Sequence, residues 1–409
     1  MLRLNAALAA QGWTFDLPSP GRAGTRLANN AGQDPRQMAT NSSGGRGALT
    51  QRKASLKGRV FFLNGNAHRA MRMRRRKFLV LGLSAAAAVG GGLAWRAFST
   101  EVALARLRVS TGSTVFQSRF GAMEYATAGN GPPCLMIHGT GGGFDQGLAF
   151  AAPLVAAGWR VIAPSRFGYL RSTLPENPSS EKQADAFVDL MDELRIARAP
   201  VIGGSAGALS AMQFAIRHPD RCSALVAIVP AAYAPDHAPA RPPNALARAI
   251  IQHGLRSDLL FWFGLIVGED AMIGALLATD PALVHAAAAP QERARVRSIL
   301  RDIQPVSLRA EGLLNDGALA GDPKPMELAR IIAPTFVASL EDDRFETAAA
   351  ARHIASSVLG AELVIYPSGG HVWVGRNDDL FARIDGFLRK HDPALSAAKR
   401  LSTLKGPQP

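Results

Sequence analysis

The segment VIGGSAG, residues 201–207, constrains the fold of this chain more than any other. An apolar, strand-like run ends in two glycines, and a helix-like pattern begins directly after Ser205 and Ala206. A strand that turns at once into a helix strains its central residue, and the residues two before and two after it must be small. Gly203 and Gly207 occupy those two positions. The segment therefore predicts a sharp strand–turn–helix corner that carries the Ser205 hydroxyl at its tip.

Two interpretations of this corner are open from the segment alone. It can be a glycine-rich turn with an incidental serine, since the chain contains 40 glycines. Alternatively, Ser205 is a nucleophile, and the Ala206 amide at the helix start helps to hold a developing oxyanion. The second interpretation requires partners, because a serine hydroxyl attacks well only when a base accepts its proton and an acid orients that base.

Strand-like and helix-like patterns alternate from about residue 105 onward. A hairpin pattern covers residues 113–129, and helical patterns cover residues 181–197 and 207–218. Short apolar runs rich in β-formers lie around them: CLMIHG, RVIAPS, PVIGGS, ALVAIVP, PTFVASL and ELVIYP. This alternation predicts an α/β fold with a mainly parallel twisted sheet covered by helices on both faces. We assign residues 105–230 and 334–390 to this core.

The alternation is interrupted once, between residues 231 and 333. This segment lacks a clear strand pattern and contains apolar helical stretches, among them LLFWFGLIVG at 259–268. That stretch is too short to span a bilayer, which takes about 17–25 residues. A helix that is apolar all round is expected to be buried on more than one side. We therefore predict a helical cap over residues 231–333.

A carboxylate and a histidine follow the last two predicted strands. Glu341, Asp342 and Asp343 come directly after the run PTFVASL, and His371 follows the run ELVIYP and two glycines. We select Asp343 as the orienting acid, with Asp342 as the alternative, and His371 as the base. The chain order Ser205, Asp343, His371 is the one expected when the corner lies on a parallel sheet of this kind.

The charge of the chain is concentrated at its N-terminal end. The formal net charge is +14, but residues 1–77 hold 15 of the 46 Lys and Arg residues and 2 of the 32 Asp and Glu residues. The remaining 31 basic and 30 acidic residues nearly balance. We therefore expect no nucleic-acid partner, because the excess charge belongs to a leader and not to the globular part.

The leader has two parts. Residues 1–70 are polar, without sustained apolar periodicity, and we expect them to be disordered. Residues 71–96 have the layout of an export signal, with a basic cluster before an apolar run at 78–95, and RRKFL resembles a twin-arginine signal. The 18-residue run is also long enough for a membrane anchor. We expect export in a bacterium, with a periplasmic or an inner-membrane-anchored product facing outward.

Two further expectations concern the ends of the chain and its cysteines. Because an export signal belongs near an N-terminus, we expect translation to begin at Met71 or Met73, and residues 391–409 to form a polar tail. Cys134 and Cys222 lie in or beside apolar strand-like runs, and no Cys or Cys/His cluster indicates a metal. We therefore expect two core cysteines and no metal site.

Together these motifs resemble the α/β-hydrolase superfamily over about residues 110–390. The resemblance rests on five segments in the family's order: His138-Gly139-Thr140-Gly141-Gly142, APSRFGYLRS at 163–172, the corner at 203–207 with IRHPDR at 216–221, Asp343, and Gly370-His371. The superfamily contains esterases, lipases, lactonases, C–C bond hydrolases and cofactor-free haloperoxidases. Ser165 and Phe167 stand at positions where many relatives have Asp and Pro.

The resemblance implies a serine hydrolase that cleaves an ester-like bond of a small, apolar substrate. The loop after His138 supplies the second oxyanion amide, which we place on Thr140, with Gly141 as the alternative. No metal or organic cofactor is required. A C–C bond hydrolase, a haloperoxidase or perhydrolase, and a non-catalytic binding module remain alternatives on the same fold.

We predict an apolar substrate pocket above Ser205, walled by Phe144, Trp262 and Trp373. Apolar pockets with a few polar groups are the usual form of small-molecule sites. The alternative is that the run around Trp262 forms the core of the cap itself. The pocket interpretation predicts that kcat/KM rises with the acyl length of p-nitrophenyl esters, and that Trp262→Ala flattens the rise.

Overall fold

The computed structural model describes residues 51–235, 251–287 and 289–391, with side chains from residue 71 onward. The chain divides at residue 100 into two compact units, and each is described by itself. In the first unit, all described residues belong to helix α2 (Gln51–Ser110), which continues into the second unit. The predicted disorder is therefore wrong for residues 51–70, which are helical, whereas residues 1–50 lie outside the described part. Helix formation propagates readily into a segment that precedes an Ala-rich helix.

The apolar run of the leader lies inside this helix. The portion Met71–Ser110 is long and apolar enough to cross a membrane, judged by length and composition. Its large apolar side chains between Phe78 and Trp95 are exposed in the structure. The export signal and the anchor remain predictions.

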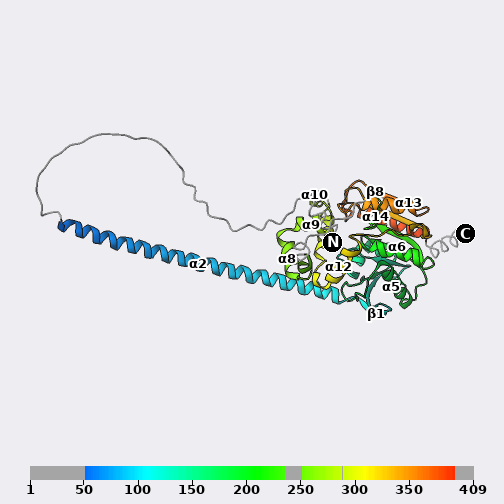
Figure 1. Ribbon diagram of the computed structural model, residues 1–409, viewed down its shortest axis with the longest axis horizontal. Helices are drawn as coiled ribbons and strands as arrows, with labels where there is room; N and C mark the ends of the chain where they lie inside the picture. Colours follow the sequence, from blue (N-terminus) through cyan, green and yellow to red (C-terminus); the bar gives the residue numbers. More distant parts are fainter. Residues whose placement is uncertain (1–50, 236–250, 288, 392–409) are drawn as a thin grey trace, which may run out of the picture. The chain divides into compact units, whose positions relative to one another are not determined.

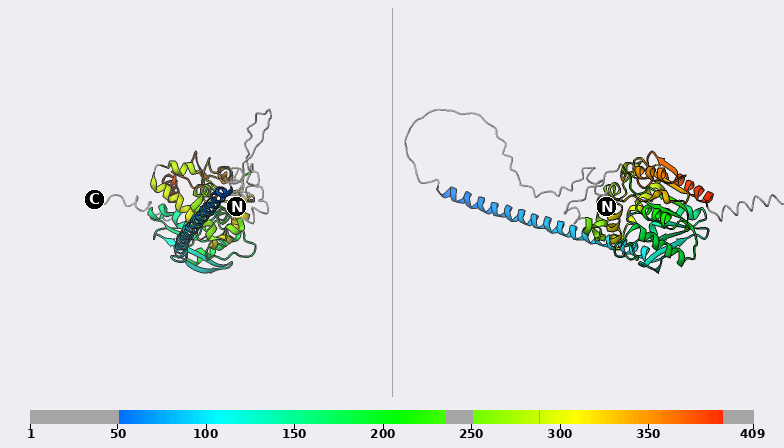
Figure 2. Two further views of the ribbon diagram at one scale, coloured as in Figure 1. Left: turned by 90° about the vertical axis from the view of Figure 1, so that its left-hand side faces the viewer. Right: turned by 45° about the vertical axis from the view of Figure 1, so that its right-hand side comes forward.

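The second unit is built on an eight-stranded sheet with the order β1-β2-β4-β3-β5-β6-β7-β8. β1 pairs antiparallel with β2, as the hairpin pattern predicts, β2 pairs antiparallel with β4, and the other neighbours are parallel. In Figures 1 and 2 the blue-green first strands and the orange last strand lie at opposite edges. The strands are β1 (Thr114–Ser118), β2 (Gly121–Ala128), β3 (Pro133–Ile137), β4 (Arg160–Pro164), β5 (Ala199–Gly204), β6 (Cys222–Ile228), β7 (Thr335–Leu340) and β8 (Glu362–Tyr366).

Helices cover both faces of this sheet, which confirms the predicted α/β fold. Along β3, Leu135 and Ile137 join one buried cluster, whereas Cys134 and Met136 join another on the opposite face. This alternation follows from the strand geometry, and burial on both faces is typical of parallel strands. Residues of α5 (Ser180–Glu193), α6 (Gly207–Arg217) and α13 (Thr347–Ser357) belong to the first cluster. The second cluster includes residues of α4 (Ala152–Ala156) and α14 (Asn377–His391), and α3 (Phe144–Phe150) packs against it.

Both cysteines are core residues, as predicted. Cys134 and Cys222 are free and fully buried, and burial raises the pKa of each thiol to about 12. A thiol in such a setting stays protonated and behaves as a small apolar side chain.

The described residues between β6 and β7 form a helical cap with its own apolar cluster. Residues 236–250 and 288 of the predicted cap lie outside the described residues. Figure 1 shows α8, α9, α10 and α12 grouped at one end of the unit. The cap comprises α8 (Asp258–Val267), α9 (Glu269–Leu276), α10 (Pro281–Ala286), α11 (Pro290–Arg301), η1 (Val306–Leu308), α12 (Ala310–Leu319) and η2 (Leu328–Arg330).

One expectation for the cap is wrong. Helix α8 was expected to be buried on more than one side, but its apolar side chains divide between two faces. Phe261, Trp262 and Leu265 are buried, whereas Phe263 and Ile266 are exposed by 56% and 58%. Among the described residues, Phe261 and Leu265 pack into the apolar cluster of the cap, and Trp262 bonds Glu101, so the opposite side of α8 stays exposed.

Candidate active site

Ser205 lies at the corner between β5 and α6, in the conformation that the sequence predicts. Its φ angle of 52° lies in the left-handed region, which costs strain for a residue with a side chain. A Cβ atom on Gly203 would lie 2.7 Å from Ala208 Cα, and one on Gly207 would lie 2.5 Å from the carbonyl oxygen of His138. The Ser205 amide donates to the Ile228 carbonyl at 2.9 Å, which ties the corner to β6. Positions 203 and 207, two residues before and after Ser205, therefore accommodate only glycine.

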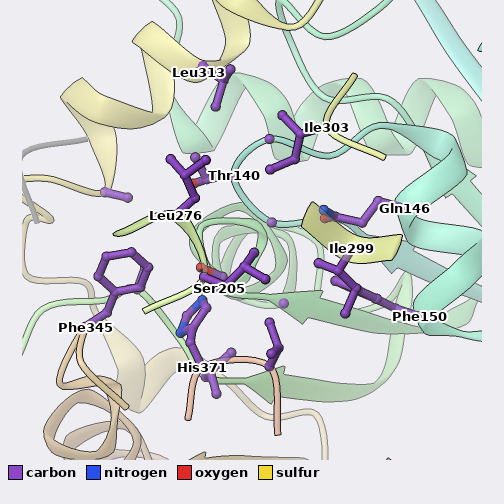
Figure 3. Close-up of a pocket in the computed structure, with 18 of the residues that line it drawn as sticks. Thr140, Gln146, Phe150, Ser205, Leu276, Ile299, Ile303, Leu313, Phe345 and His371 are labelled. Carbon is purple, nitrogen blue, oxygen red and sulfur yellow. Dashed lines mark hydrogen bonds between the residues drawn. The ribbon is translucent and has the colours of Figure 1, made fainter. Parts of the chain in front are cut away.

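The structure brings His371 and Asp343 to Ser205. His371 Nε2 lies 2.9 Å from Ser205 Oγ, and His371 Nδ1 lies 2.8 Å from Asp343 Oδ2. Figure 3 shows the imidazole directed at the serine from the loop after β8. The three residues come from the carboxyl ends of β5, β7 and β8, which meet at one edge of a parallel sheet. The imidazole can therefore accept the Ser205 proton while Asp343 holds its other nitrogen.

The two candidate carboxylates have separate partners. Asp343 is 3% exposed, and its Oδ1 accepts from the Phe345 amide at 2.9 Å while its Oδ2 accepts from the Thr347 hydroxyl. Asp342 instead accepts from the amides of Gly369 and Gly370 at 3.0 and 2.9 Å. Asp343 thus faces the histidine, and Asp342 fixes the glycine loop that carries it.

Two backbone amides near Ser205 are available for an oxyanion. Within the described residues, neither the Thr140 nor the Ala206 amide donates to another backbone or side-chain group. The Gly141 amide, the alternative, donates to the Tyr169 hydroxyl at 3.1 Å. The β3–α3 loop lies close against the corner, since a Cβ atom on Gly139 would lie 3.1 Å from Ser205 Cβ. This geometry favours Thr140 over Gly141.

A largely apolar pocket opens above Ser205 and His371. Figure 3 shows side chains of the cap and of the β7–α13 loop surrounding the two polar groups. The polar side chains of the lining are those of Thr140, Gln146, Ser205 and His371. The apolar side chains of the lining are those of Phe150, Val229, Ala231, Leu255, Phe261, Leu276, Leu277, Ile299, Ile303, Leu313, Ala320, Phe345, Val372 and Trp373.

Of the three predicted pocket residues, Trp373 lies in this lining and the other two do not. Phe144, the first residue of α3, is buried in a small cluster with the strand residues Ala126 and Ala163. Trp262 turns away from the pocket, and its Nε1 donates to Glu101 Oε2 at 2.9 Å. Its neighbour Phe261 faces the pocket instead, since adjacent residues of a helix are about 100° apart.

A family profile described as alpha/beta hydrolase fold matches residues 132–374. The chain is an α/β-hydrolase. The hydrolase is 26% identical over 277 residues to the uncharacterised hydrolase YcgS of Bacillus subtilis (strain 168), which covers 63% of this chain and 90% of YcgS. It is 28% identical over 263 residues to a 2-hydroxy-6-oxononadienedioate/2-hydroxy-6-oxononatrienedioate hydrolase of Paraburkholderia xenovorans (strain LB400), covering 61% and 84% of the two chains.

A solved structure agrees with this assignment. An alpha/beta hydrolase fold protein from Nakamurella multipartita superposes with a TM-score of 0.53 at 27% identity, covering 68% of this hydrolase and 99% of that chain. The family assignment, the named hydrolases and the shared fold establish a hydrolase.

The β3–α3 loop, residues 138–143, carries the Thr140 amide that is the candidate oxyanion donor, and it is named the oxyanion loop. It is braced by residues that are not among the predicted site residues. Tyr169 is fully buried, and its hydroxyl donates to Asp316 Oδ2 at 2.5 Å while it accepts from Gly141. Arg166 donates to both oxygens of Asp316, at 2.6 and 2.5 Å. Burial, and then the Asp316 carboxylate, raises the pKa of Tyr169 well above its ordinary value, so the hydroxyl keeps its proton. Tyr169 thereby links Asp316 of the cap helix α12 to the Gly141 amide of the loop.

A second cap residue, Arg309, holds the same loop. It is fully buried and donates to the Gly142 carbonyl and to both oxygens of Asp145, at 3.2 and 2.7 Å. Burial alone would raise the pKa of Asp145, but Arg309 and then Arg108 outweigh it and lower the pKa below its ordinary value. Neither brace can be recognised from the sequence, because Arg309 and Asp145 are 164 residues apart and Tyr169 and Asp316 are 147 residues apart.

His138 supports the loop from within. Its Nε2 accepts from the Arg166 amide at 2.9 Å, so Nδ1 carries the proton and donates to the Gly139 carbonyl at 2.7 Å. Burial and then Arg166 lower the pKa of His138 well below its ordinary value. A neutral ring is required, because a second ring proton would point at the Arg166 amide.

Proposed function

We propose that this hydrolase cleaves a neutral carboxylic ester with an apolar acyl group, through an acyl-enzyme on Ser205. The observation that carries the proposal is the hydrogen-bonded series Ser205 Oγ–His371 Nε2 at 2.9 Å and His371 Nδ1–Asp343 Oδ2 at 2.8 Å. A nucleophile, a base and an orienting acid in this geometry are what acyl transfer requires.

The proposed reaction has two halves. Ser205 Oγ attacks the ester carbonyl carbon while His371 Nε2 takes its proton, and Asp343 stabilises the imidazolium. The amides of Thr140 and Ala206 hold the negatively charged oxygen of the tetrahedral intermediate. His371 then gives the proton to the departing alcohol. In the second half a water molecule, deprotonated by His371, attacks the acyl-enzyme, and the carboxylic acid leaves with Ser205 restored.

The chemistry of the pocket supports a neutral substrate. No Arg or Lys stands in the lining that the described residues provide, and its side chains are mostly apolar. A carboxylate brought into such a pocket would lose hydration without gaining a counter-ion, at a cost of several kcal/mol. An uncharged acyl chain gains about 0.8 kcal/mol for each buried methylene.

C–C bond hydrolysis is the second candidate, and the 28% identity to the Paraburkholderia xenovorans hydrolase favours it. The same serine, histidine and carboxylate would serve that reaction. The name of that relative denotes a dicarboxylate substrate, however, and the described pocket lining offers no cation to receive one. We therefore rank it below ester hydrolysis.

The test combines active-site labelling with turnover. The purified protein is expected to react with a fluorophosphonate and to hydrolyse p-nitrophenyl butyrate, and Ser205→Ala should abolish both. Ser210→Ala is the matched control, because Ser210 is a buried serine of α6 whose hydroxyl donates to Gly207. Labelling that persists in Ser205→Ala contradicts the proposal. A higher kcat/KM for a 2-hydroxy-6-oxo-dienoate than for the ester selects the second candidate.

A further inference from the structure

Helix α8 presents an apolar face to the outside of the cap. Its exposed side chains recur at three- and four-residue intervals, which places them on one side of the helix. They form the α8 outer face: Leu259, Leu260, Phe263, Ile266 and Val267, exposed by 42%, 57%, 56%, 58% and 64%. Contiguous apolar surface of this kind on a soluble protein marks an interaction site.

Two contacts tie this helix to the chain that follows the apolar leader run. Trp262 Nε1 donates to Glu101 Oε2 at 2.9 Å, and Arg106 Nη2 donates to Asp258 Oδ2 at 2.7 Å. Arg106 also donates to Ser307, which itself bonds Asp258. The start of α8 is therefore held against residues 101–106.

We propose that the α8 outer face docks on the lipid bilayer that receives residues 78–95. Glu101 follows Trp95 by six residues, and six residues reach at most about 20 Å in any conformation. A run that inserts in the bilayer thus keeps Glu101, and with it α8, within that distance of the membrane surface. An apolar helix face at this position binds in the interface by burying its side chains among the acyl chains.

The charges around the face indicate an uncharged lipid surface. Glu269, at the start of α9, pairs with Arg297 and Arg301 at 3.0 and 3.1 Å. Asp258 pairs with Arg106, and Asp270 pairs with His285. Since each of these three carboxylates has a basic partner, the docking energy comes from the apolar side chains. Phosphatidylcholine vesicles are the corresponding probe.

Docking there gives the pocket access to lipid. The inner face of α8 contributes Phe261 to the pocket that also contains Ser205, so one helix has one side toward the bilayer and the other toward the site. An ester dissolved in the membrane could pass from lipid to pocket without crossing water. This part of the inference rests on the proposed function, whereas the docking itself does not.

The test measures contact with acyl chains in the full-length protein, reconstituted in phosphatidylcholine vesicles with brominated chains. Single cysteines at Phe263→Cys and Ile266→Cys carry an environment-sensitive fluorophore, since the native Cys134 and Cys222 are fully buried. Leu83→Cys reports insertion of the leader run. Leu359→Cys, 99% exposed after α13, is the matched control away from α8.

Docking predicts quenching by bromine at 263 and 266 and at 83, and none at 359. The absence of quenching at both α8 positions overturns the proposal, whether or not position 83 is quenched. A label at 263 that is shielded from water, unquenched by bromine, and able to cross-link to a second chain also overturns it, because another copy then covers the face.

A second measurement tests delivery of substrate. Leu260→Asp with Phe263→Asp should lower turnover of a long-chain ester carried in the vesicles by at least about tenfold, with p-nitrophenyl butyrate turnover in solution unchanged. An equal loss on both substrates overturns the delivery role. If the unaltered protein cleaves neither ester, the proposed function fails, and the quenching result still decides the docking.

Discussion

Asp342 and Asp343 are consecutive residues whose carboxylates hold different groups of one loop, the loop after β8. Asp343 lies 2.8 Å from His371 Nδ1, whereas Asp342 accepts from the Gly369 and Gly370 amides at 3.0 and 2.9 Å. An amide at position 343 favours the wrong histidine tautomer, so Asp343→Asn should lower kcat for p-nitrophenyl butyrate by about 10⁴-fold.

Asp342→Asn is the matched control for this change. It keeps one oxygen acceptor for the loop amides and leaves the His371–Asp343 contact in place. We expect a loss of about tenfold or less, from a loosened loop worth about 1–2 kcal/mol. Steady-state kinetics on both variants decides the assignment, and equal losses or the reverse order would exchange the roles of the two carboxylates.

Tyr169→Phe tests the brace on the oxyanion loop. The substitution keeps the ring and removes the hydroxyl that links the Gly141 amide to Asp316. We expect kcat to fall by about tenfold with little change in KM, because the Thr140 amide acts on the transition state and not on bound substrate. Tyr366→Phe, which loses a hydroxyl contact to Asp379 at 2.7 Å outside the pocket, should leave kcat unchanged. A change confined to KM would assign Tyr169 to substrate binding.

Because Phe261 and not Trp262 lines the pocket, we expect Phe261 to determine how kcat/KM depends on acyl length. kcat/KM for p-nitrophenyl esters should rise from acetate to butyrate by up to about fourfold for each methylene buried. Phe261→Ala removes a wall of the pocket and should flatten that rise, whereas Trp262→Ala should preserve its slope. A slope flattened by Trp262→Ala alone would place the acyl chain elsewhere.

The Asp145–Arg309 pair predicts a pH dependence of stability. The pKa of Asp145 is lower in the folded protein than its ordinary value near 3.8. The pair therefore stabilises fully at pH values above the unfolded pKa, and its contribution is lost as the pH falls through the folded pKa. Asp145→Asn leaves Arg309 buried without its charge partner and should cost about 3 kcal/mol at pH 7.

The measurement is thermal unfolding of both proteins from pH 8 to pH 3. The difference in Tm should be constant down to about pH 5 and shrink below about pH 4, where protonation makes the natural protein resemble the variant. Asp322→Asn, which alters an exposed pair with Lys324, should change Tm little at any pH. A difference that widens at low pH contradicts the sign.

The sequence by itself determined the sheet and the corner. A parallel strand is buried on both faces, so its sequence is a nearly continuous apolar run, as in CLMIHG and PVIGGS. Such a run can be recognised within a few consecutive residues. The corner was equally readable, because the clash that excludes a side chain at Gly203 involves Ala208, five residues away. The order Ser205, Asp343, His371 along the chain is the one expected for such a corner on a parallel sheet.

Only the tertiary structure decided how the cap meets the site. Phe261 and Trp262 are adjacent and both apolar, so periodicity could not tell which one faces Ser205; the contact between Trp262 and Glu101 settles it. The braces from Asp316 and Arg309 to the oxyanion loop join residues about 150 apart. A charged side chain normally indicates a solvent-facing position, and Asp316 and Arg309 are buried because their partners come from the other part of the fold. Such pairings depend on how distant elements pack, and that information is absent from any local segment.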